Sequence, residues 1–283
     1  MIVFLNGQFV PAAEAMVSIF DRSFLYGDGL FETMRVSGGR LFRWEQHAER
    51  LRLGAEFLKV RLPYPLAELR RTAGELIERN ALPDAILRLT LSRGVGARGY
   101  SILGADAPTL AMTLHPATVF TPEHPPQTRL FTASIRVPAD DALATFKTCS
   151  KLAQILARTE AEARGADEAL LLNTHDEVAE VAAGNLFWIA GTTVHTPPLS
   201  AGVLAGVTRA VALELCAALG LKTQESAIPL AALHRSDGVF LTNSAVGIAE
   251  AVELDGQRLP RSPLVRELQL AYQELLRRET LPK

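Results

Sequence analysis

The feature that most constrains this chain is a proline-rich stretch near its middle, HPATVFTPEHPPQ, at residues 115–127. It holds four prolines in thirteen positions. Proline removes an amide donor and restricts the residue before it, so such a stretch interrupts both strands and helices. We therefore expect a linker at residues 119–127. It would separate a smaller N-terminal α+β domain, residues 1–118, from a larger C-terminal domain, residues 128–283.

Hydrophobic patterning predicts helices and strands on both sides of this linker. The opening MIVFLNGQFV has a turn pair, Asn6-Gly7, between two apolar runs, which predicts a hairpin. Periodicity predicts further strands at 31–36, 40–42, 85–92, 109–114, 128–137, 168–172, 178–180, 186–189 and 238–242, and helices at 43–59, 65–80, 151–164, 207–219 and 264–278. For the helix at 151–164 we expect Ser150 as the N-cap and a buried face made by Leu152, Ile155, Leu156 and Thr159.

Composition excludes several classes of function. The chain is 48% hydrophobic and 21% charged with a net charge of −2, which predicts a soluble globular protein that binds neither nucleic acid nor membrane. No apolar run approaches the roughly 18 residues of a membrane span. Two cysteines and six scattered histidines predict a reduced, cytoplasmic setting and no metal site.

Lysine is rare in this chain. Five lysines occur, and two of them, Lys147 and Lys151, lie four positions apart in FKTCSKLAQIL. Arginine serves equally well as a surface charge, but only lysine forms a Schiff base. Lys147 precedes the predicted helix by one short loop, where a side chain often enters a cleft and where an apolar setting lowers a lysine pKa. Taken alone, each lysine still reads as ordinary surface charge.

Three further positions are compatible with binding an anionic, aromatic cofactor. Glu180 ends a predicted strand among small apolar residues, and a pyridinium nitrogen would be a suitable partner for its carboxylate. Gly206 precedes a predicted helix whose first amides, at Val207 and Thr208, would be available to a phosphate. Arg50 could add a bidentate contact to that phosphate. Each of these residues alone also fits a turn or a solvated charge.

Several motifs taken in order resemble the class IV (fold type IV) pyridoxal-phosphate enzymes, which include branched-chain and D-amino acid aminotransferases and 4-amino-4-deoxychorismate lyases. The motifs are DRSFLYGDGLFET, EQHAERL, the Lys147 segment, DEALLLN, EVAEVAAGNLFW, TPPLSAGVLAGVTR and LTNSAVGI. They extend from about residue 3 to residue 255. The resemblance implies a two-domain α+β fold, with an active site for pyridoxal 5'-phosphate (PLP) at the domain interface, and a homodimer.

The resemblance also implies roles for individual residues. Lys147 would be the Schiff-base lysine and proton carrier, and Glu180 the partner of the pyridine nitrogen. The phosphate would be bound by Arg50, Gly206, the amides of Val207 and Thr208, and the Ser244 hydroxyl. Substrate carboxylate would be bound by Arg98 and Tyr100, with Phe31 and Thr33 in the pocket. Lys151 stands where relatives carry tyrosine or arginine, so its role stays open.

The loop SRGVGARGYS resembles the SRGxGxRGYS stretch of the 4-amino-4-deoxychorismate lyases, and GNLFW and TNSAVGI point the same way. These residues favour a lyase that forms 4-aminobenzoate and pyruvate in the folate pathway. The segment AEAVELDG after TNSAVGI departs from the lyases, which commonly carry a proline there. An aminotransferase acting on D-amino acids, branched-chain amino acids or amines is the alternative, and a non-catalytic binding protein that retains the fold is a third. No GxSxG nucleophile elbow is present, which argues against an α/β hydrolase.

Overall fold

The computed structural model describes residues 1–281 and divides into two compact units. Unit 1 contains Met1–Val119, Phe146–Lys151 and the residues from Leu276 on, and unit 2 contains Phe120–Thr145 and Leu152–Leu275. The first change of unit, after Val119, lies within the proline-rich stretch. The Lys147 segment, expected in the C-terminal domain, belongs to unit 1, because its backbone pairs with a strand of that unit.

Unit 1 is built on a six-stranded antiparallel sheet of order β2-β1-β6-β5-β3-β4. The strands are β1 (Ile2–Leu5), β2 (Gln8–Pro11), β3 (Gly29–Ser37), β4 (Arg40–Leu41), β5 (Ala85–Ser92) and β6 (Thr109–Pro116). The predicted hairpin is confirmed, since Asn6 and Gly7 both have positive φ and join β1 to β2. A turn with two positive φ angles matches the right-handed twist of the paired strands.

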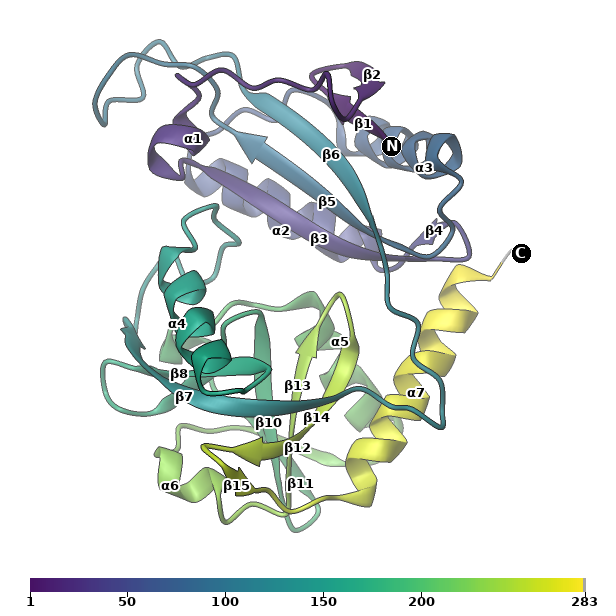
Figure 1. Ribbon diagram of the computed structural model, residues 1–283, viewed down its shortest axis with the longest axis vertical. Coiled ribbons are helices and arrows are strands. Elements are labelled where there is room, and N and C mark those ends of the chain that lie inside the picture. The colour runs from purple at the N-terminus through teal and green to yellow at the C-terminus, as the bar shows by residue number, and fades with distance from the viewer. Residues whose placement is uncertain (282–283) are drawn as a thin grey trace. The chain divides into compact units, whose positions relative to one another are not determined.

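The helices of unit 1 are α1 (Arg22–Tyr26), α2 (Trp44–Phe57) and α3 (Leu66–Asn80). Helices α2 and α3 cover one face of the sheet (Figure 1), where Leu30, Met34 and Leu87 pack into the core. Side chains alternate along a strand, so Phe31, Thr33 and Arg88 lie on the other face. Helix α1 was not predicted, because five residues are too few to show a helical period. The Asp21 side chain caps this helix by accepting a hydrogen bond from the Ser23 amide.

Unit 2 is built on a nine-stranded mixed sheet. Its main strand order is β12-β11-β10-β13-β14-β7-β8-β9, and β15 pairs with β14 outside this order. Its strands are β7 (Gln127–Val137), β8 (Glu168–Asn173), β9 (Val178–Val181), β10 (Gly184–Ala190), β11 (Thr193–Thr196), β12 (Lys222–Glu225), β13 (Gly238–Asn243), β14 (Gly247–Leu254) and β15 (Gln257–Arg258). Its helices are α4 (Leu152–Ala163), α5 (Val207–Ala218) and α6 (Leu230–Leu233), with the 3-10 turn η1 (Leu199–Ala201). The closing helix α7 covers Pro263–Thr280. Within residues 1–281, every helix is too short or too polar to cross a lipid bilayer.

Helix α4 differs from its prediction in two ways. It begins at Leu152, two residues after Ser150, so Ser150 does not stand at the N-cap position. The expected buried face is also wrong, because Leu152, Ile155 and Leu156 are 67%, 59% and 48% exposed. The buried residues of the helix are Ala157 and Ala161, whose small side chains allow close packing on β7 and β8. Apolar spacing indicates a helix but does not reveal which face is covered.

Candidate active site

Lys147 lies on the edge of the unit 1 sheet, beside the start of β3. The Phe31 amide donates to the Lys147 carbonyl at 2.9 Å, and the Cys149 amide donates to the Gly29 carbonyl at 2.8 Å. These bonds extend the sheet by a short antiparallel segment. Lys147 and Phe31 are directly opposed, and the Lys147 Nζ atom lies 4.7 Å from the centroid of the Phe31 ring. The lysine is therefore held on the sheet face opposite α2 and α3.

Arg88 shares this face and contacts the same aromatic ring. Its guanidinium carbon lies 3.9 Å from the Phe31 centroid, and its Nε donates to the Thr90 hydroxyl at 3.3 Å. Burial lowers the pKa of Arg88, whereas Cys149 raises it. Among residues 1–281, no carboxylate forms a salt bridge with Arg88. A half-buried guanidinium of this kind is suited to an anionic ligand.

The other face of β3 carries a buried cluster of charged residues under α2. Arg50 donates to Glu32 through Nε at 2.8 Å and through Nη2 at 2.7 Å, and His47 Nδ1 lies 2.6 Å from the same carboxylate. His47 and Arg50 are three residues apart on one face of α2, so one carboxylate from β3 meets both. Glu32 thus fixes the plane and the direction of the Arg50 guanidinium.

Charge in this cluster is set by burial and by ion pairing. Burial by itself raises the pKa of Glu32, but the Arg50 charge and the His47 and Arg50 hydrogen bonds outweigh it and lower the pKa to about 2. Burial lowers the pKa of His47, with Glu32 opposing and Arg50 and Lys147 adding to the decrease. Glu32 is therefore ionised and His47 neutral at pH 7, with His47 donating its Nδ1 proton to Glu32.

The loop that follows β5 is held by an arginine of α1. Arg22 donates from Nη1 to the carbonyls of Gly99 and Ser101, at 2.9 and 3.1 Å. Its Nε is bound to Asp28 at 2.7 Å, and Arg93 binds the same carboxylate through Nε and Nη2. The loop backbone is fixed in this way, while the Arg98 side chain is exposed. Tyr100 is 88% exposed and packs edge-on against Tyr26.

In unit 2, the Glu180 carboxylate accepts from neutral donors. Its Oε2 accepts from the Leu204 amide at 3.0 Å and from the Asn185 side-chain amide at 3.4 Å. Asn185 also donates to the Leu204 carbonyl at 2.8 Å. These hydrogen bonds orient the carboxylate through neutral groups, so they add no positive charge of their own beside it. A carboxylate oriented in this way can accept from a protonated pyridine nitrogen.

Gly206 begins α5, and a larger residue would not fit there. A Cβ atom at this position would lie 2.0 Å from Asn185 Oδ1. Gly206 caps the twelve-residue helix without a side chain, so the Val207 and Thr208 amides at its first turn are available to an anion. Ser244 lies in the turn between β13 and β14, where the Asn243 side chain accepts from the Ala245 and Val246 amides.

Each unit supplies residues that fit one part of PLP. Unit 1 supplies an amine on an aromatic ring and a fixed arginine. Unit 2 supplies an oriented carboxylate, a helix start that only glycine can make, and a buried hydroxyl at Thr242 that has no hydrogen-bond partner among the described side chains. The sequence reasoning missed Glu32, His47, Arg88 and Asn185. The spacing of His47 and Arg50 on α2 was the available signal for the Glu32 cluster, whereas nothing local marked Arg88.

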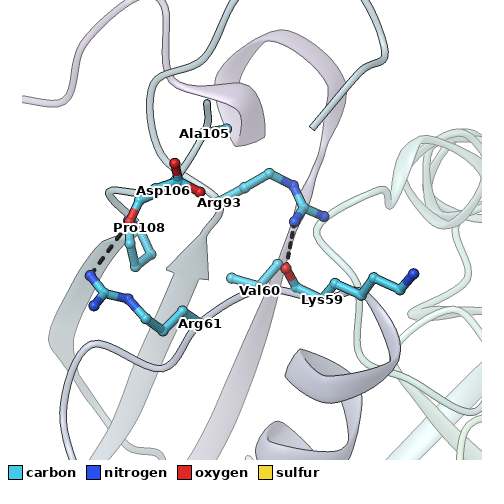
Figure 2. A pocket seen from close by; sticks show the side chains of 7 residues that line it. All are labelled: Lys59, Val60, Arg61, Arg93, Ala105, Asp106 and Pro108. Carbon is cyan, nitrogen blue, oxygen red and sulfur yellow. Dashed lines mark hydrogen bonds between the residues drawn. The ribbon is translucent and has the colours of Figure 1, made fainter. Parts of the chain in front are cut away.

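A cavity of ≈ 340 Å³ lies elsewhere in unit 1 (Figure 2), and its lining consists of Lys59, Val60, Arg61, Arg93, Ala105, Asp106 and Pro108. None of the residues assigned to PLP lines it. Its arginines are already engaged: Arg93 donates to the Leu58 and Lys59 carbonyls, and Arg61 to the Asp106 carbonyl. The cavity is therefore not the candidate active site.

Comparison with known proteins decides the family. The profile of the amino-transferase class IV family matches residues 29–254. This chain belongs to that family. A proposed branched-chain-amino-acid aminotransferase of Methanocaldococcus jannaschii is 33% identical over 91% of this chain and 89% of its own length. An aminodeoxychorismate lyase of Vibrio harveyi is 31% identical over 89% of this chain and 94% of its own length.

A solved structure gives the same result for the fold and points to the cofactor. A branched-chain amino acid aminotransferase of T.th., determined with pyridoxamine 5'-phosphate, has a TM-score of 0.90 and 27% identity. The match covers 96% of this chain and 93% of that one. The mixed α+β fold of the class IV aminotransferases is confirmed, and the protein is a PLP-dependent enzyme. Relatives with different reactions match at similar identity, so the family does not fix the reaction.

Proposed function

We propose that this protein is a 4-amino-4-deoxychorismate lyase, which eliminates pyruvate from its substrate to give 4-aminobenzoate in the folate pathway. The observation that carries the proposal is the loop Ser92–Ser101, whose sequence resembles that of the lyases and whose backbone is fixed by Arg22. The lyase of Vibrio harveyi, which is similar over most of its length, supports the same reaction.

Each proposed cofactor residue has a distinct task. When bound, PLP supplies an electron-withdrawing ring that makes the proton on the amine-bearing carbon acidic. Lys147 would hold the cofactor covalently and would carry a proton at Nζ, with Phe31 limiting the positions that Nζ can take. Glu180 would hold the pyridine nitrogen in its protonated form. The phosphate would be bound by Arg50, by the first amides of α5 at Val207 and Thr208, and by the Ser244 hydroxyl.

The proposed substrate carries two carboxylates, and unit 1 offers two arginines to bind them. Arg88 lies on the Phe31 ring beside Lys147, so it would bind a carboxylate close to the reacting carbon. Arg98 and Tyr100 project from the Ser92–Ser101 loop and would bind the second carboxylate, in the same subunit or in a partner. Thr33, on the same sheet face as Phe31 and Arg88, would line the pocket.

An aminotransferase is the second candidate function. It is favoured by the 33% identity to the Methanocaldococcus jannaschii protein and by chemistry, because proton removal by Lys147 would begin both reactions. The two reactions differ in what they require. Elimination converts one substrate into 4-aminobenzoate and pyruvate without a further reactant, whereas amino transfer requires a 2-oxo acid acceptor.

One assay separates the two functions. The purified enzyme, loaded with PLP, is given 4-amino-4-deoxychorismate alone, and in parallel D-alanine or L-leucine with 2-oxoglutarate. We expect 4-aminobenzoate and pyruvate in equal amounts from the first mixture, and little glutamate from the second. Glutamate formation without 4-aminobenzoate would replace the lyase with an aminotransferase.

We also propose that the enzyme is a cytoplasmic homodimer. Both cysteines are free thiols, as expected in a reducing compartment. Exposed apolar side chains include Phe20 and Phe24 in unit 1 and Leu152 and Ile155 on α4 in unit 2. Apolar residues that gather in an exposed patch often mark protein–protein contacts, and we expect a second copy to cover these. Light scattering of wild type and of an Ile155→Glu variant tests this, with a dimeric mass expected for the first and a monomeric mass for the second.

A further inference from the structure

One buried side chain, Asn185, contacts both of the features of unit 2 that are assigned to the cofactor. We propose that Asn185 is a positioning residue, which fixes the Glu180 carboxylate relative to the first turn of α5. This inference rests on the proposed roles of Glu180 and Gly206. Asn185 itself would touch neither the substrate nor the cofactor, so its effect is exerted through these two neighbours.

The sheet register places Asn185 beside Glu180. Asn185 on β10 is the cross-strand partner of Glu180 on β9 and of Thr242 on β13. It is only 4% exposed, so a hydrogen bond lost here is not replaced by bulk water. A neutral amide in this position supplies two N–H donors, whereas an aspartate of the same shape would supply none.

Three groups form a closed ring of hydrogen bonds around Oε2 of Glu180. The Asn185 Nδ2 atom donates to Oε2 at 3.4 Å and to the Leu204 carbonyl at 2.8 Å. The Leu204 amide then donates back to Oε2 at 3.0 Å. The side chain of Asn185 thus links the carboxylate to the loop before α5. Loss of either donor would weaken the restraint that these bonds place on the Glu180 carboxylate.

The oxygen of the same amide lies against the backbone at the start of α5. A Cβ at Gly206 would approach Asn185 Oδ1 to 2.0 Å, so the backbone of Gly206 packs directly on this atom. Gly206 immediately precedes the Val207 amide proposed to bind phosphate. One amide group therefore positions both ends of a cofactor, the nitrogen end through Nδ2 and the phosphate end through Oδ1.

Two variants and one control separate positioning from general stability. Asn185→Asp keeps the shape but removes both donors and places a second negative charge against Glu180. Asn185→Leu keeps most of the volume without any polar group. Asn173→Ala is the control, because Asn173 is also fully buried in unit 2 but bonds Glu177, His175 and Ala201 instead. Each protein is prepared without cofactor and titrated with PLP.

The dissociation constant for PLP and the ¹⁵N chemical shift of its ring nitrogen are measured, together with the thermal midpoint of the cofactor-free form. We expect both Asn185 variants to bind PLP roughly tenfold more weakly, and Asn185→Asp to change the ¹⁵N shift. Asn173→Ala should lower the thermal midpoint but leave the dissociation constant and the shift unchanged. If both Asn185 variants match wild type in affinity and shift, or Asn173→Ala reproduces their losses, the inference is wrong. If wild type itself binds no PLP, the proposed function fails instead.

Discussion

The two faces of the unit 1 sheet differ in how their charged side chains are paired. Under α2, Arg50 is bound on two nitrogens by Glu32, which also contacts His47, so the chain supplies its own counter-charge. On the other face, Lys147 and Arg88 both contact the Phe31 ring, and Arg88 has no carboxylate partner within residues 1–281. Glu32 therefore supplies a counter-charge to Arg50 from within the chain, whereas a counter-charge for Arg88 would come from an anionic ligand.

This difference separates residues that hold the site from residues that bind the substrate. A buried ion pair costs desolvation energy and stabilises the fold only while both partners are present. Changes at Glu32 should therefore act mainly on stability and on the placement of Arg50. A half-buried cation without a carboxylate partner reduces stability until a ligand binds, so changes at Arg88 should act mainly on affinity for carboxylates.

Lys147 should show the largest effect, because it is assigned to the reaction itself. We expect Lys147→Ala to lower turnover by a factor on the order of 10³ or more, since both the covalent link and the proton transfer are lost. Activity on 4-amino-4-deoxychorismate and the visible spectrum of the PLP-loaded protein are the measurements. Lys151→Ala should keep the wild-type spectrum; loss of the spectrum in that variant alone would transfer the role to Lys151.

Protonation of Glu32 should lower the free energy of unfolding at low pH. Its folded pKa of about 2 lies below the ordinary value of 4.5, so its contribution is fully present above pH 4.5 and is lost as the pH falls toward 2. The shift corresponds to about 3 kcal/mol. Urea unfolding between pH 7 and pH 2 should show this loss in wild type and not in Glu32→Gln.

At pH 7, Glu32→Gln should already be less stable than wild type by about 3 kcal/mol, because Arg50 remains buried without its carboxylate. Glu78→Gln, an exposed site on α3, serves as the control and should follow the wild-type profile. Identical pH profiles for wild type and Glu32→Gln would show that the cluster under α2 does not hold Arg50 as described.

Arg88→Gln should weaken substrate binding with a smaller effect on stability. A charge-assisted hydrogen bond to a substrate carboxylate contributes about 2 kcal/mol, so we expect KM to rise roughly 30-fold. Steady-state kinetics measure this, with Arg79→Gln on the exposed surface of α3 as the control. If Arg98→Gln raises KM and Arg88→Gln does not, the carboxylate is bound by the loop alone.

Arg22→Lys should give the smallest effect. Lysine keeps the charge facing Asp28 but lacks the second nitrogen that donates to the Gly99 and Ser101 carbonyls. Loss of about 1 kcal/mol of hydrogen bonding should raise KM roughly fivefold and leave kcat nearly unchanged. Hydrogen exchange of residues 94–104 should become faster; an unchanged exchange rate would mean that Arg22 does not restrain the loop.

Much of the fold was predictable from the sequence because local signals agreed with the packing. The Asn6-Gly7 hairpin, the strand at 85–92 and helices α2 and α3 are confirmed. The short elements α1, α6, β11, β12 and β15 were missed because they have too few residues to show a period. Strand β14 was also missed, although it has eight residues. The predicted buried face of α4 was wrong because its larger apolar residues are exposed and its alanines are buried. Sequence spacing therefore indicated the helix without indicating its environment.

The candidate site was predictable only in part. Its sequence signals were the scarcity of lysine and a glycine before a helix, together with a resemblance to known motifs. The contacts that define its chemistry join residues far apart in the chain, such as Glu32 with Arg50 and Phe31 with Lys147. Sheet register brings these pairs together, and register is not visible in one sequence. Asn185 shows this most clearly, because its role depends on having Glu180 as its cross-strand partner.

The central claim is that Lys147 carries the cofactor on the Phe31 face of the unit 1 sheet. Reduction of the PLP-loaded enzyme with borohydride fixes the cofactor to its lysine, and mass spectrometry of the digested protein identifies the residue. We predict a single modified peptide that contains Lys147, and no such adduct in Lys147→Ala. An adduct on Lys151 or Lys59, or the same yield from Lys147→Ala, would contradict this account.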